Sequence, residues 1–257
     1  MTNIHPTAII SPSAELGENV KIGAYSIIED DVIIGDNTEI MNYSLIGTRA
    51  IIGKNNKIFN SAIIGTVAQD MKYKDEPTRT IIGDDNVIRE FVTMNNGTGN
   101  GNTVVGNNNL LLSYCHIAHD NLLGNNIIIS NTVQLGGHVV VGDNVVFGGC
   151  AAVHQFCNIG NFSMIAANST ITQDVSPYSL IDRTPSFSSI NRVGLARNGF
   201  SEELRKEISS FYKLIFKSGF NNSMGIQKYI EINKNVILPE IQYIIDFINN
   251  SKRGVIR

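Results

Sequence analysis

Residues 22–63 read IGAYSI-IEDDVI-IGDNTE-IMNYSL-IGTRAI-IGKNNK-IFNSAI, and every one of these groups of six opens with isoleucine. The same pattern, an apolar residue at every sixth position, runs through residues 4–64, 82–94 and 105–171. An α-helix repeats about every 3.6 residues and a strand about every two, so neither element alone explains a period of six. Short strands that turn a corner every six residues do explain it. The sequence therefore predicts a β-solenoid, a parallel β-helix of hexapeptide repeats, over residues 1–180.

Three hexads make one triangular coil, so residues three hexads apart are expected to be neighbours on successive coils. Such coils stack about 4.8 Å apart, which is the spacing of paired strands. The second place of the hexad is often glycine, as at Gly35, Gly53 and Gly142. We expect these glycines to supply the backbone angles that tight corners require.

The hexad pattern is interrupted twice. Between Thr66 and Thr80 it fails, yet Ile82 follows Ile64 by three whole hexads, which predicts an extruded loop with the phase of the coil preserved. Around residues 97–103 the spacing shortens, and we expect a flexible loop that replaces one rung. Long loops in a compact domain are often functional.

The pattern ends after Pro177, and residues 181–200 are interpreted as a connector. Residues 201–257 are predicted to form a C-terminal α-helical domain, with Ser201 as the N-cap of its first helix. That helix is expected to close at Ser218-Gly219. Two more helices are expected, over 223–234 and 240–251. A helical cap at the end of a solenoid protects its last coil.

Charge is divided unevenly along the chain. Residues 1–182 hold 8 Lys and Arg against 17 Asp and Glu, whereas residues 183–257 hold 12 against 6. A basic tail can attract nucleic acid, phosphate-bearing ligands or an acidic protein, or can be a solvated helical surface. No apolar run is long enough to span a bilayer, and residues 1–6 lack signal-peptide features. We therefore expect a cytoplasmic protein without a membrane segment, and three cysteines are too few for a disulfide framework.

Four of the five histidines fall between residues 116 and 154. His119, Gly137 and Gln155 occupy the same hexad place at intervals of one coil, which predicts a ladder on one face of the solenoid. His138 and His154 belong to the neighbouring columns. A histidine suits general-base catalysis near neutral pH, and a glycine N–H beside it could stabilise an oxyanion.

Other interpretations of this ladder remain open. His116, His119, His138 and His154 could bind zinc, as in hexapeptide-repeat hydratases. The ladder could also be structural, in a solenoid that acts only as a scaffold. No Ser or Cys shares the column with His119, so a covalent nucleophile is not indicated.

Several segments resemble one family, the acyl-carrier-protein–UDP-N-acetylglucosamine O-acyltransferases. They are His116-Ile117-Ala118-His119-Asp120, residues 69–73 with 76–79, residues 152–157, and the terminal Arg253-Gly254. The resemblance covers essentially the whole chain. It implies a left-handed β-helix, a homotrimer with active sites between subunits, and the first step of lipid A synthesis.

The resemblance also implies roles for single residues. His119 would be the general base, Asp120 its orienting carboxylate, and the Gly137 N–H the oxyanion donor. The substrate would be positioned by Asp70, Lys72, His116, His138 and Gln155, with His154, Asn191 and Arg197 at or near the nucleotide. The partners would be acyl carrier protein, facing the basic tail, and a UDP-sugar. No metal or cofactor is expected beyond the carrier's phosphopantetheine.

The chain departs from the family at three places. Asn95-Asn96 stands where many members have His-Arg, and residues 182–185 replace a commoner Gly-Asn segment. Ala167 stands where members that accept longer chains have glycine, which predicts a shorter 3-hydroxyacyl chain. Some relatives acylate a 3-amino analogue of the sugar, and the Asn95 region leaves the acceptor open between hydroxyl and amine.

Overall fold

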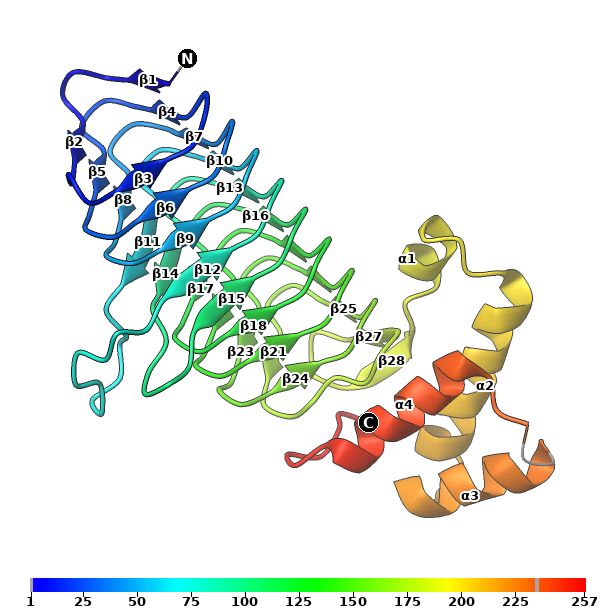
Figure 1. The fold of residues 1–257 in the computed structure, drawn as a ribbon. Coiled ribbons are helices and arrows are strands. Elements are labelled where there is room, and N and C mark those ends of the chain that lie inside the picture. The colour runs from blue at the N-terminus through cyan, green and yellow to red at the C-terminus, as the bar shows by residue number, and fades with distance from the viewer. Residues whose placement is uncertain (1, 234–235) are drawn as a thin grey trace.

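The computed structural model describes residues 2–233 and 236–257 and shows a left-handed parallel β-helix followed by helices (Figure 1). The three walls of the solenoid are three sheets. Sheet 1 consists of β1 (Asn3–Ile4), β4 (Lys21–Ile22), β7 (Glu39–Ile40), β10 (Lys57–Ile58), β13 (Val87–Ile88), β16 (Leu110–Leu111), β19 (Ile128–Ile129), β22 (Val146–Phe147), β25 (Met164–Ile165), β27 (Ser179–Ile181) and β28 (Phe187–Ile190).

Sheet 2 consists of β2 (Ile9–Ile10), β5 (Ile27–Ile28), β8 (Leu45–Ile46), β11 (Ile63–Thr66), β14 (Thr93–Asn95), β17 (His116–Ile117), β20 (Gln134–Leu135), β23 (Ala152–Val153) and β26 (Thr170–Ile171). Sheet 3 consists of β3 (Glu15–Leu16), β6 (Ile33–Ile34), β9 (Ile51–Ile52), β12 (Thr80–Ile82), β15 (Thr103–Val105), β18 (Leu122–Leu123), β21 (Val140–Val141) and β24 (Asn158–Ile159).

The predicted hexads and the observed strands coincide. The apolar residue that opens each hexad lies in one of the strands β1–β26 and points into the core, where nearly all of these side chains are buried. Ile117 pairs with Leu135, and Leu135 with Val153, so residues three hexads apart are neighbours as expected. The β-solenoid prediction is confirmed, because burial of one apolar side chain per strand specifies this register.

The expected reason for the glycines was wrong. The left-handed backbone angles fall at the fourth place of the hexad, on residues such as Asn37, Asp120 and His138, with φ near +58°. Most second-place glycines lack a positive φ and are needed for space instead. A Cβ at Gly47 would lie 2.2 Å from the carbonyl oxygen of Gly65 on the next coil. The close stacking of coils therefore excludes a side chain at such a glycine, whereas other hexads carry one at the second place, as at Met41 and Phe59.

The expected register at both interruptions was also wrong. Ile82 pairs with Ile52 on sheet 3, whereas Ile64 lies on sheet 2, so the first insertion is a long corner between two walls. Met94 on sheet 2 likewise leads directly to Val105 on sheet 3, and no rung is replaced. At an ordinary corner, the inward-facing residues of the two flanking strands lie one hexad apart in the sequence. Ile64 and Ile82 lie three hexads apart, and Met94 and Val105 nearly two. Both loops therefore project from the same edge of the solenoid, on successive coils.

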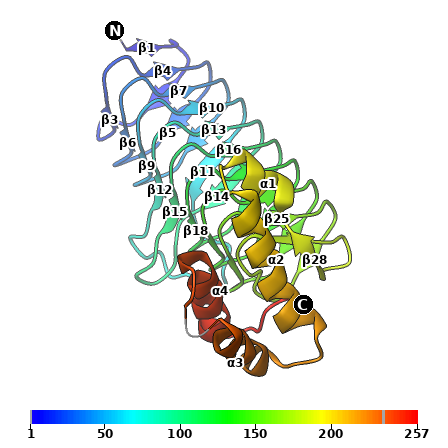
Figure 2. The same ribbon diagram turned by 90° about the vertical axis from the view of Figure 1, so that its right-hand side faces the viewer.

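The helices lie at the C-terminal end of the solenoid, against its last coils (Figures 1 and 2). They are α1 (Arg192–Arg197), α2 (Glu202–Lys217), α3 (Asn222–Ile232) and α4 (Pro239–Asn250). Ser201 caps α2 by accepting a hydrogen bond from the N–H of Leu204, and Ser218 ends it, as expected. The predicted end of the next helix at residue 234 lies outside the described residues.

The segment 181–200 is more regular than a connector. It holds β28, which pairs antiparallel with β27, and the short helix α1. The chain end then returns to the solenoid, where the main chain of Asp174 bonds to that of Gly254 and Ile256. The Asp174 carboxylate accepts the hydroxyl of Ser251 at 2.7 Å. None of the described helices is long and apolar enough to cross a membrane.

Candidate active site

A cavity of about 870 Å³ opens at the corner between sheets 2 and 3. Its walls come from three successive parts of that edge: the first insertion, the second insertion and the corners that follow β17, β20 and β23. The lining residues are Gln69, Asp70, Met71, Lys72, Glu76, Thr98, Gly99, His119, His138, Gln155 and Phe156. The structure thus brings together five of the predicted site residues, Asp70, Lys72, His119, His138 and Gln155.

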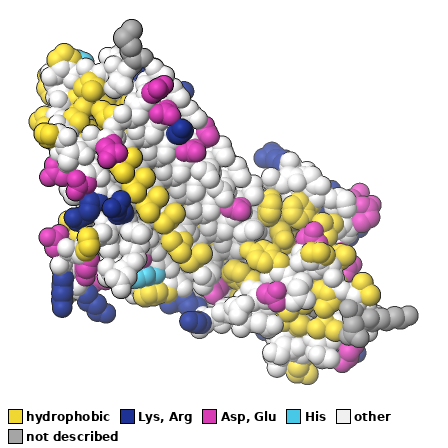
Figure 3. Space-filling model, in the orientation of Figure 1, with side chains coloured by type: hydrophobic (Ala, Val, Ile, Leu, Met, Phe, Trp, Pro, Cys, Tyr) yellow, Lys and Arg dark blue, Asp and Glu magenta, His cyan; other side chains and the backbone are white. Residues whose placement is uncertain are grey.

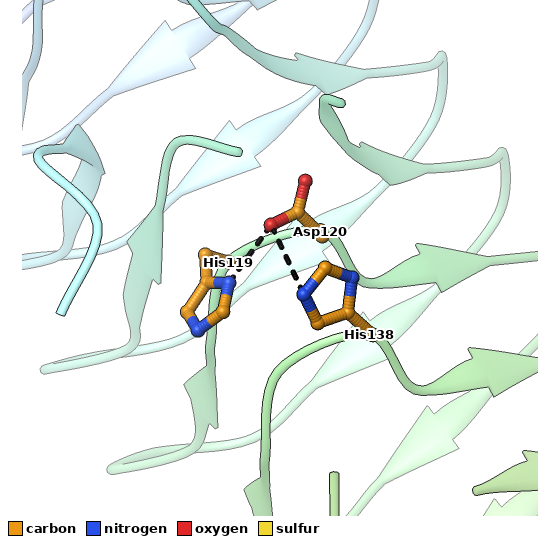
Figure 4. A group of neighbouring side chains, drawn as sticks. All are labelled: His119, Asp120 and His138. Atoms are coloured by element: carbon orange, nitrogen blue, oxygen red, sulfur yellow. Dashed lines mark hydrogen bonds and ion pairs between the residues drawn. The ribbon is translucent and has the colours of Figure 1, made fainter. Parts of the chain in front are cut away.

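His119 and Asp120 form a hydrogen-bonded pair in this wall. Nδ1 of His119 lies 2.8 Å from Oδ2 of Asp120, and both side chains are nearly buried. Because a carboxylate oxygen accepts, Nδ1 is the protonated nitrogen and Nε2 carries the free lone pair. Figure 4 shows Nε2 directed away from Asp120. This is the arrangement of a general base with an orienting carboxylate.

Asp120 is held from a second side by Thr98. The Thr98 N–H lies 3.0 Å from Oδ1, and the Thr98 hydroxyl donates to Oδ2 at 2.7 Å. Burial raises the pKa of Asp120, but the hydrogen bonds from His119 and Thr98 outweigh burial and leave it below its usual value. The carboxylate is therefore ionised at neutral pH and can stabilise a positive charge on His119.

His138 stands beside this pair. Its Nε2 lies 3.7 Å from Oδ2 of Asp120, and its ring meets that of His119 edge to face at 5.1 Å (Figure 4). The ring of Phe156, one coil further on, stacks on His138 at 4.6 Å. This stacking fixes the plane of the imidazole, since offset aromatic pairs are stable in that geometry. His138 thus presents a fixed polar edge to the cavity.

Gly137 is buried against the ring of His119. A Cβ at this position would lie 2.6 Å from both Cε1 and Nε2 of that ring, so only glycine fits. At the edge between sheets 3 and 1, the N–H at this hexad place is often capped by a side chain one coil on, as Asn125 caps Asn107 at 2.8 Å. The N–H of Gly137, at the edge between sheets 2 and 3, has no acceptor among the residues described.

The remaining predicted residues lie outside the cavity lining. Nδ1 of His116, in β17, bonds to the Thr93 hydroxyl at 2.8 Å, and burial, followed by the charge of His119, lowers the pKa of His116. His154 is exposed, with Nδ1 3.3 Å from the Arg253 guanidinium.

The other predicted residues lie further from the cavity. Asn191 caps α1, where it accepts the Gly194 N–H, and Arg197 lies in the last turn of that helix. Ala167 is exposed at the opposite edge of sheet 2.

The departure at Asn95-Asn96 is buried beneath the two insertions. Nδ2 of Asn95 donates to the Thr66 hydroxyl and to the Val67 carbonyl, at 3.1 and 2.9 Å. Oδ1 of Asn96 accepts the Thr80 hydroxyl at 2.9 Å. Neither side chain lines the cavity, so this departure alters the support of the loops and not the cavity wall.

Metal binding is poorly matched to these groups. Within the described residues, the three side chains that come close enough to share an ion are His119, Asp120 and His138, and not the four histidines of the zinc alternative. Oδ2 of Asp120 already accepts hydrogen bonds from His119 and Thr98. A bound ion would have to displace both donors. The arrangement suits proton transfer better than metal ligation.

Comparisons with known proteins agree with the resemblance found in the sequence. A family model described as "Udp N-acetylglucosamine O-acyltransferase; Domain 2" matches residues 174–256. An acyl-[acyl-carrier-protein]–UDP-N-acetylglucosamine O-acyltransferase of Neisseria meningitidis serogroup B is 46% identical over 260 residues, and one of Alkalilimnicola ehrlichii is 43% identical. Both alignments cover 100% of each chain. The chain belongs to the UDP-N-acetylglucosamine O-acyltransferase family.

Solved structures place the whole chain in the same family. LpxA from Acinetobacter baumannii superposes with a TM-score of 0.94 at 41% identity, over 99% of both chains. LpxA from Bacteroides fragilis gives 0.95 at 43% identity, over 98% of this chain and 99% of that one. The left-handed β-helix with C-terminal helices is therefore the fold of the O-acyltransferase family.

Two residues of this candidate site were missed by sequence reasoning. Thr98 lies in an insertion without periodicity, so its approach to Asp120 could not be inferred from the hexads. Phe156 is in the hexad place of Asp120 and His138, one coil beyond His138. The coil length that placed Gln155 could have placed Phe156 as well.

Proposed function

We propose that this protein transfers a 3-hydroxyacyl chain from acyl carrier protein to the 3-hydroxyl of UDP-N-acetylglucosamine, the first step of lipid A synthesis. The observation that carries the proposal is the His119–Asp120 pair, whose imidazole lines a cavity beside Lys72. The names of full-length relatives specify both substrates.

In the proposed mechanism, Nε2 of His119 takes the proton from the 3-hydroxyl as its oxygen attacks the thioester carbonyl carbon. A tetrahedral intermediate forms, and its collapse breaks the carbon–sulfur bond and leaves the ester on the sugar. The imidazolium returns its proton to the departing phosphopantetheine thiolate. Asp120 stabilises the imidazolium between these two transfers, and no proton or electron is left unaccounted for.

Gly137 is proposed to stabilise the oxyanion of that intermediate. Its N–H lacks an acceptor among the residues described, and its backbone touches the ring of His119. A donor fixed in advance beside the base is effective because it needs no reorganisation during the reaction. This support is geometric and is independent of the family resemblance.

The sugar and nucleotide are proposed to lie along the first insertion. Asp70 and Lys72 lie in its wall of the cavity, and Lys72 is a cation suited to a diphosphate. His138 and Gln155 face them from the solenoid. We propose that His116, His154, Asn191 and Arg197 contribute beyond this cavity, along the path of the acyl chain or the nucleotide. No cofactor other than the carrier's phosphopantetheine is required.

Turnover tests this function directly. Purified protein is supplied with 3-hydroxyacyl carrier proteins of graded chain length and with either UDP-N-acetylglucosamine or its 3-amino analogue. We expect an ester product from the first sugar. Transfer to the amine alone would replace the acceptor in the proposal, and absence of transfer to either sugar would contradict it.

A homotrimer is proposed because two different walls, sheets 1 and 3, carry apolar rows on their outer surfaces over the middle coils, whereas the row on sheet 2 ends at Ile63. The row on sheet 3 crosses the face in view in Figure 3 and consists of Ile33, Ile51, Ile81, Val104, Leu122 and Val140. The row on sheet 1 consists of Val87, Leu110, Ile128, Val146 and Met164. Such rows mark interaction sites, and pairing of two unlike faces closes into a ring.

Replacement of Leu122 by lysine is expected to dissociate the assembly. Leu122 is 47% exposed in the single chain and lies in the apolar row of sheet 3. A buried lysine without a partner is unfavourable at an interface, so light scattering should report a monomer. The control is Ile9→Lys in the first coils of sheet 2, where the side chain is 65% exposed. An intact assembly in L122K, or a monomeric parent protein, would contradict the proposal.

Ala167 is proposed to limit the length of the acyl chain. It lies across sheet 2 from His119, so in a ring of subunits it would face the acyl chain bound at a neighbouring copy. Ala167→Gly removes one methyl group and is expected to shift the preference toward longer acyl chains. The measurement is relative kcat/KM across the carrier-protein series, and an unchanged preference would rule out this role.

The C-terminal region is basic, which suits the binding of an acidic acyl donor. Residues 183–257 carry 12 Lys and Arg against 6 Asp and Glu, and we propose that this surface meets the acidic carrier protein. Together with the UDP-sugar acceptor, this partner implies a cytoplasmic location.

A further inference from the structure

The second insertion, residues 96–103, crosses directly over Asp120. Three hydrogen-bond contacts from Thr98 reach its carboxylate: the N–H at 3.0 and 3.1 Å, and the hydroxyl at 2.7 Å. The loop approaches so closely that a Cβ on Gly101 would lie 2.1 Å from Oδ1 of Asp120. The loop therefore covers the carboxylate and donates to both of its oxygens, one of which, Oδ2, also accepts from His119.

We propose that Thr98 is a positioning residue of this site, which orients the Asp120 carboxylate and through it the imidazole of His119. This inference rests on the proposed role of His119 as the general base. A single hydrogen bond to Nδ1 would leave the carboxylate free to rotate about its own axis. Donors on both of its oxygens fix its plane, and the plane of the carboxylate determines the direction of Nε2.

Thr98 is itself held by the end of the first insertion. The hydroxyl of Thr78 donates to the Gly97 carbonyl at 2.6 Å, and that of Thr80 donates to Oδ1 of Asn96 at 2.9 Å. The N–H of Arg79 donates to Oδ1 of Asn102 at 2.9 Å. The loop that carries Asp70 and Lys72 thus supports the loop that carries Thr98. Both insertions leave the same edge of the solenoid on consecutive coils, and this position brings them into contact.

The environment of Asp120 agrees with this role. Asp120 is 9% exposed, and burial alone would favour the protonated form of its carboxyl group. The hydrogen bonds from His119 and Thr98 reverse that preference and lower its pKa. Removal of the Thr98 hydroxyl leaves a more basic and less constrained carboxylate.

The test is Thr98→Val, which keeps the shape of the side chain and removes the hydroxyl. We expect kcat to fall about 10- to 100-fold, as for loss of a hydrogen bond to a charged group, with little change in KM. The acid limb of the pH profile of kcat/KM should move to higher pH, because a more basic Asp120 carboxylate favours the protonated, inactive form of the imidazole that it orients. Thr98→Ser keeps the hydroxyl and should restore both the rate and the profile.

Thr48 provides a matched control on an early coil. Its N–H and hydroxyl both donate to the Glu29 carboxylate, each at 2.9 Å, so Thr48→Val removes the same kind of contact away from the site. A kcat or acid limb in T98V equal to that of T48V would overturn the inference. So would failure of Thr98→Ser to restore the rate. If the unsubstituted protein transfers no acyl chain, the proposed function fails first, before any variant is compared.

Discussion

Replacement of His119 by alanine is expected to reduce acyl transfer by about 10³- to 10⁴-fold, the usual effect of removing a general base. Its Nε2 carries the lone pair that faces the cavity, while Nδ1 is committed to Asp120. Among the described residues, His138 is the nearest other imidazole, but its own Nε2 is directed toward Asp120 (Figure 4). It therefore cannot take over the proton transfer without rotation.

The measurement is the initial rate of ester formation at saturating substrates, together with a thermal unfolding curve. His5→Ala is the matched control, since His5 is an exposed histidine of the first coil whose ring, among the residues the structure describes, bonds to the nearby Thr7 alone. We expect H5A to keep the parental rate and H119A to keep the parental fold. Undiminished transfer by a folded H119A protein would remove His119 from the mechanism.

Gly137→Ala is expected to reduce kcat by about 10²- to 10³-fold, comparable to the loss of an oxyanion donor. The added methyl group would meet Cε1 and Nε2 of His119 at 2.6 Å, closer than non-bonded atoms approach. The imidazole must move away from Asp120, or the corner must shift and carry the Gly137 N–H with it. Either displacement separates the base from the oxyanion donor.

Gly17→Ala serves as the control for this substitution. A Cβ at Gly17, on an early coil away from the site, would lie 2.5 Å from Oδ1 of Asp36, which is a comparable clash. Any loss of stability from crowding between coils should appear in both variants, so G17A should keep the parental rate while G137A loses it. Equal activity of G137A and G17A would show that the space beside His119 is not needed for catalysis.

Most of the solenoid could be predicted from the sequence because one physical requirement repeats. Each strand must bury a single apolar side chain, and this requirement recurs at residues such as Ile22, Ile117 and Leu135. The six-residue period and the closed triangular coil then follow, and the spacing of three hexads places Gly137 and Gln155 in the column of His119. Periodicity did not reveal why glycine is frequent at the second place, because the cause is contact between coils.

The two insertions mark the limit of such inference. A spacing of three hexads between Ile64 and Ile82 fits one full coil and also fits a single enlarged corner, so the sequence alone could not choose between them. Pairing of Ile82 with Ile52 decides for the corner. Only then do both loops fall on the edge that holds His119.

The sequence by itself determined the wall of the site, because the period of the buried side chains sets the distance along the chain between neighbouring coils. It also determined the family, through motifs that a periodic scaffold does not require. The tertiary structure alone decided what encloses the site. The contact of Thr98 with Asp120 joins two irregular segments, whose path depends on hydrogen bonds such as that between Thr78 and Gly97. Hydrogen bonds of this kind depend on direction and distance in space, and neither leaves a periodic trace in the chain.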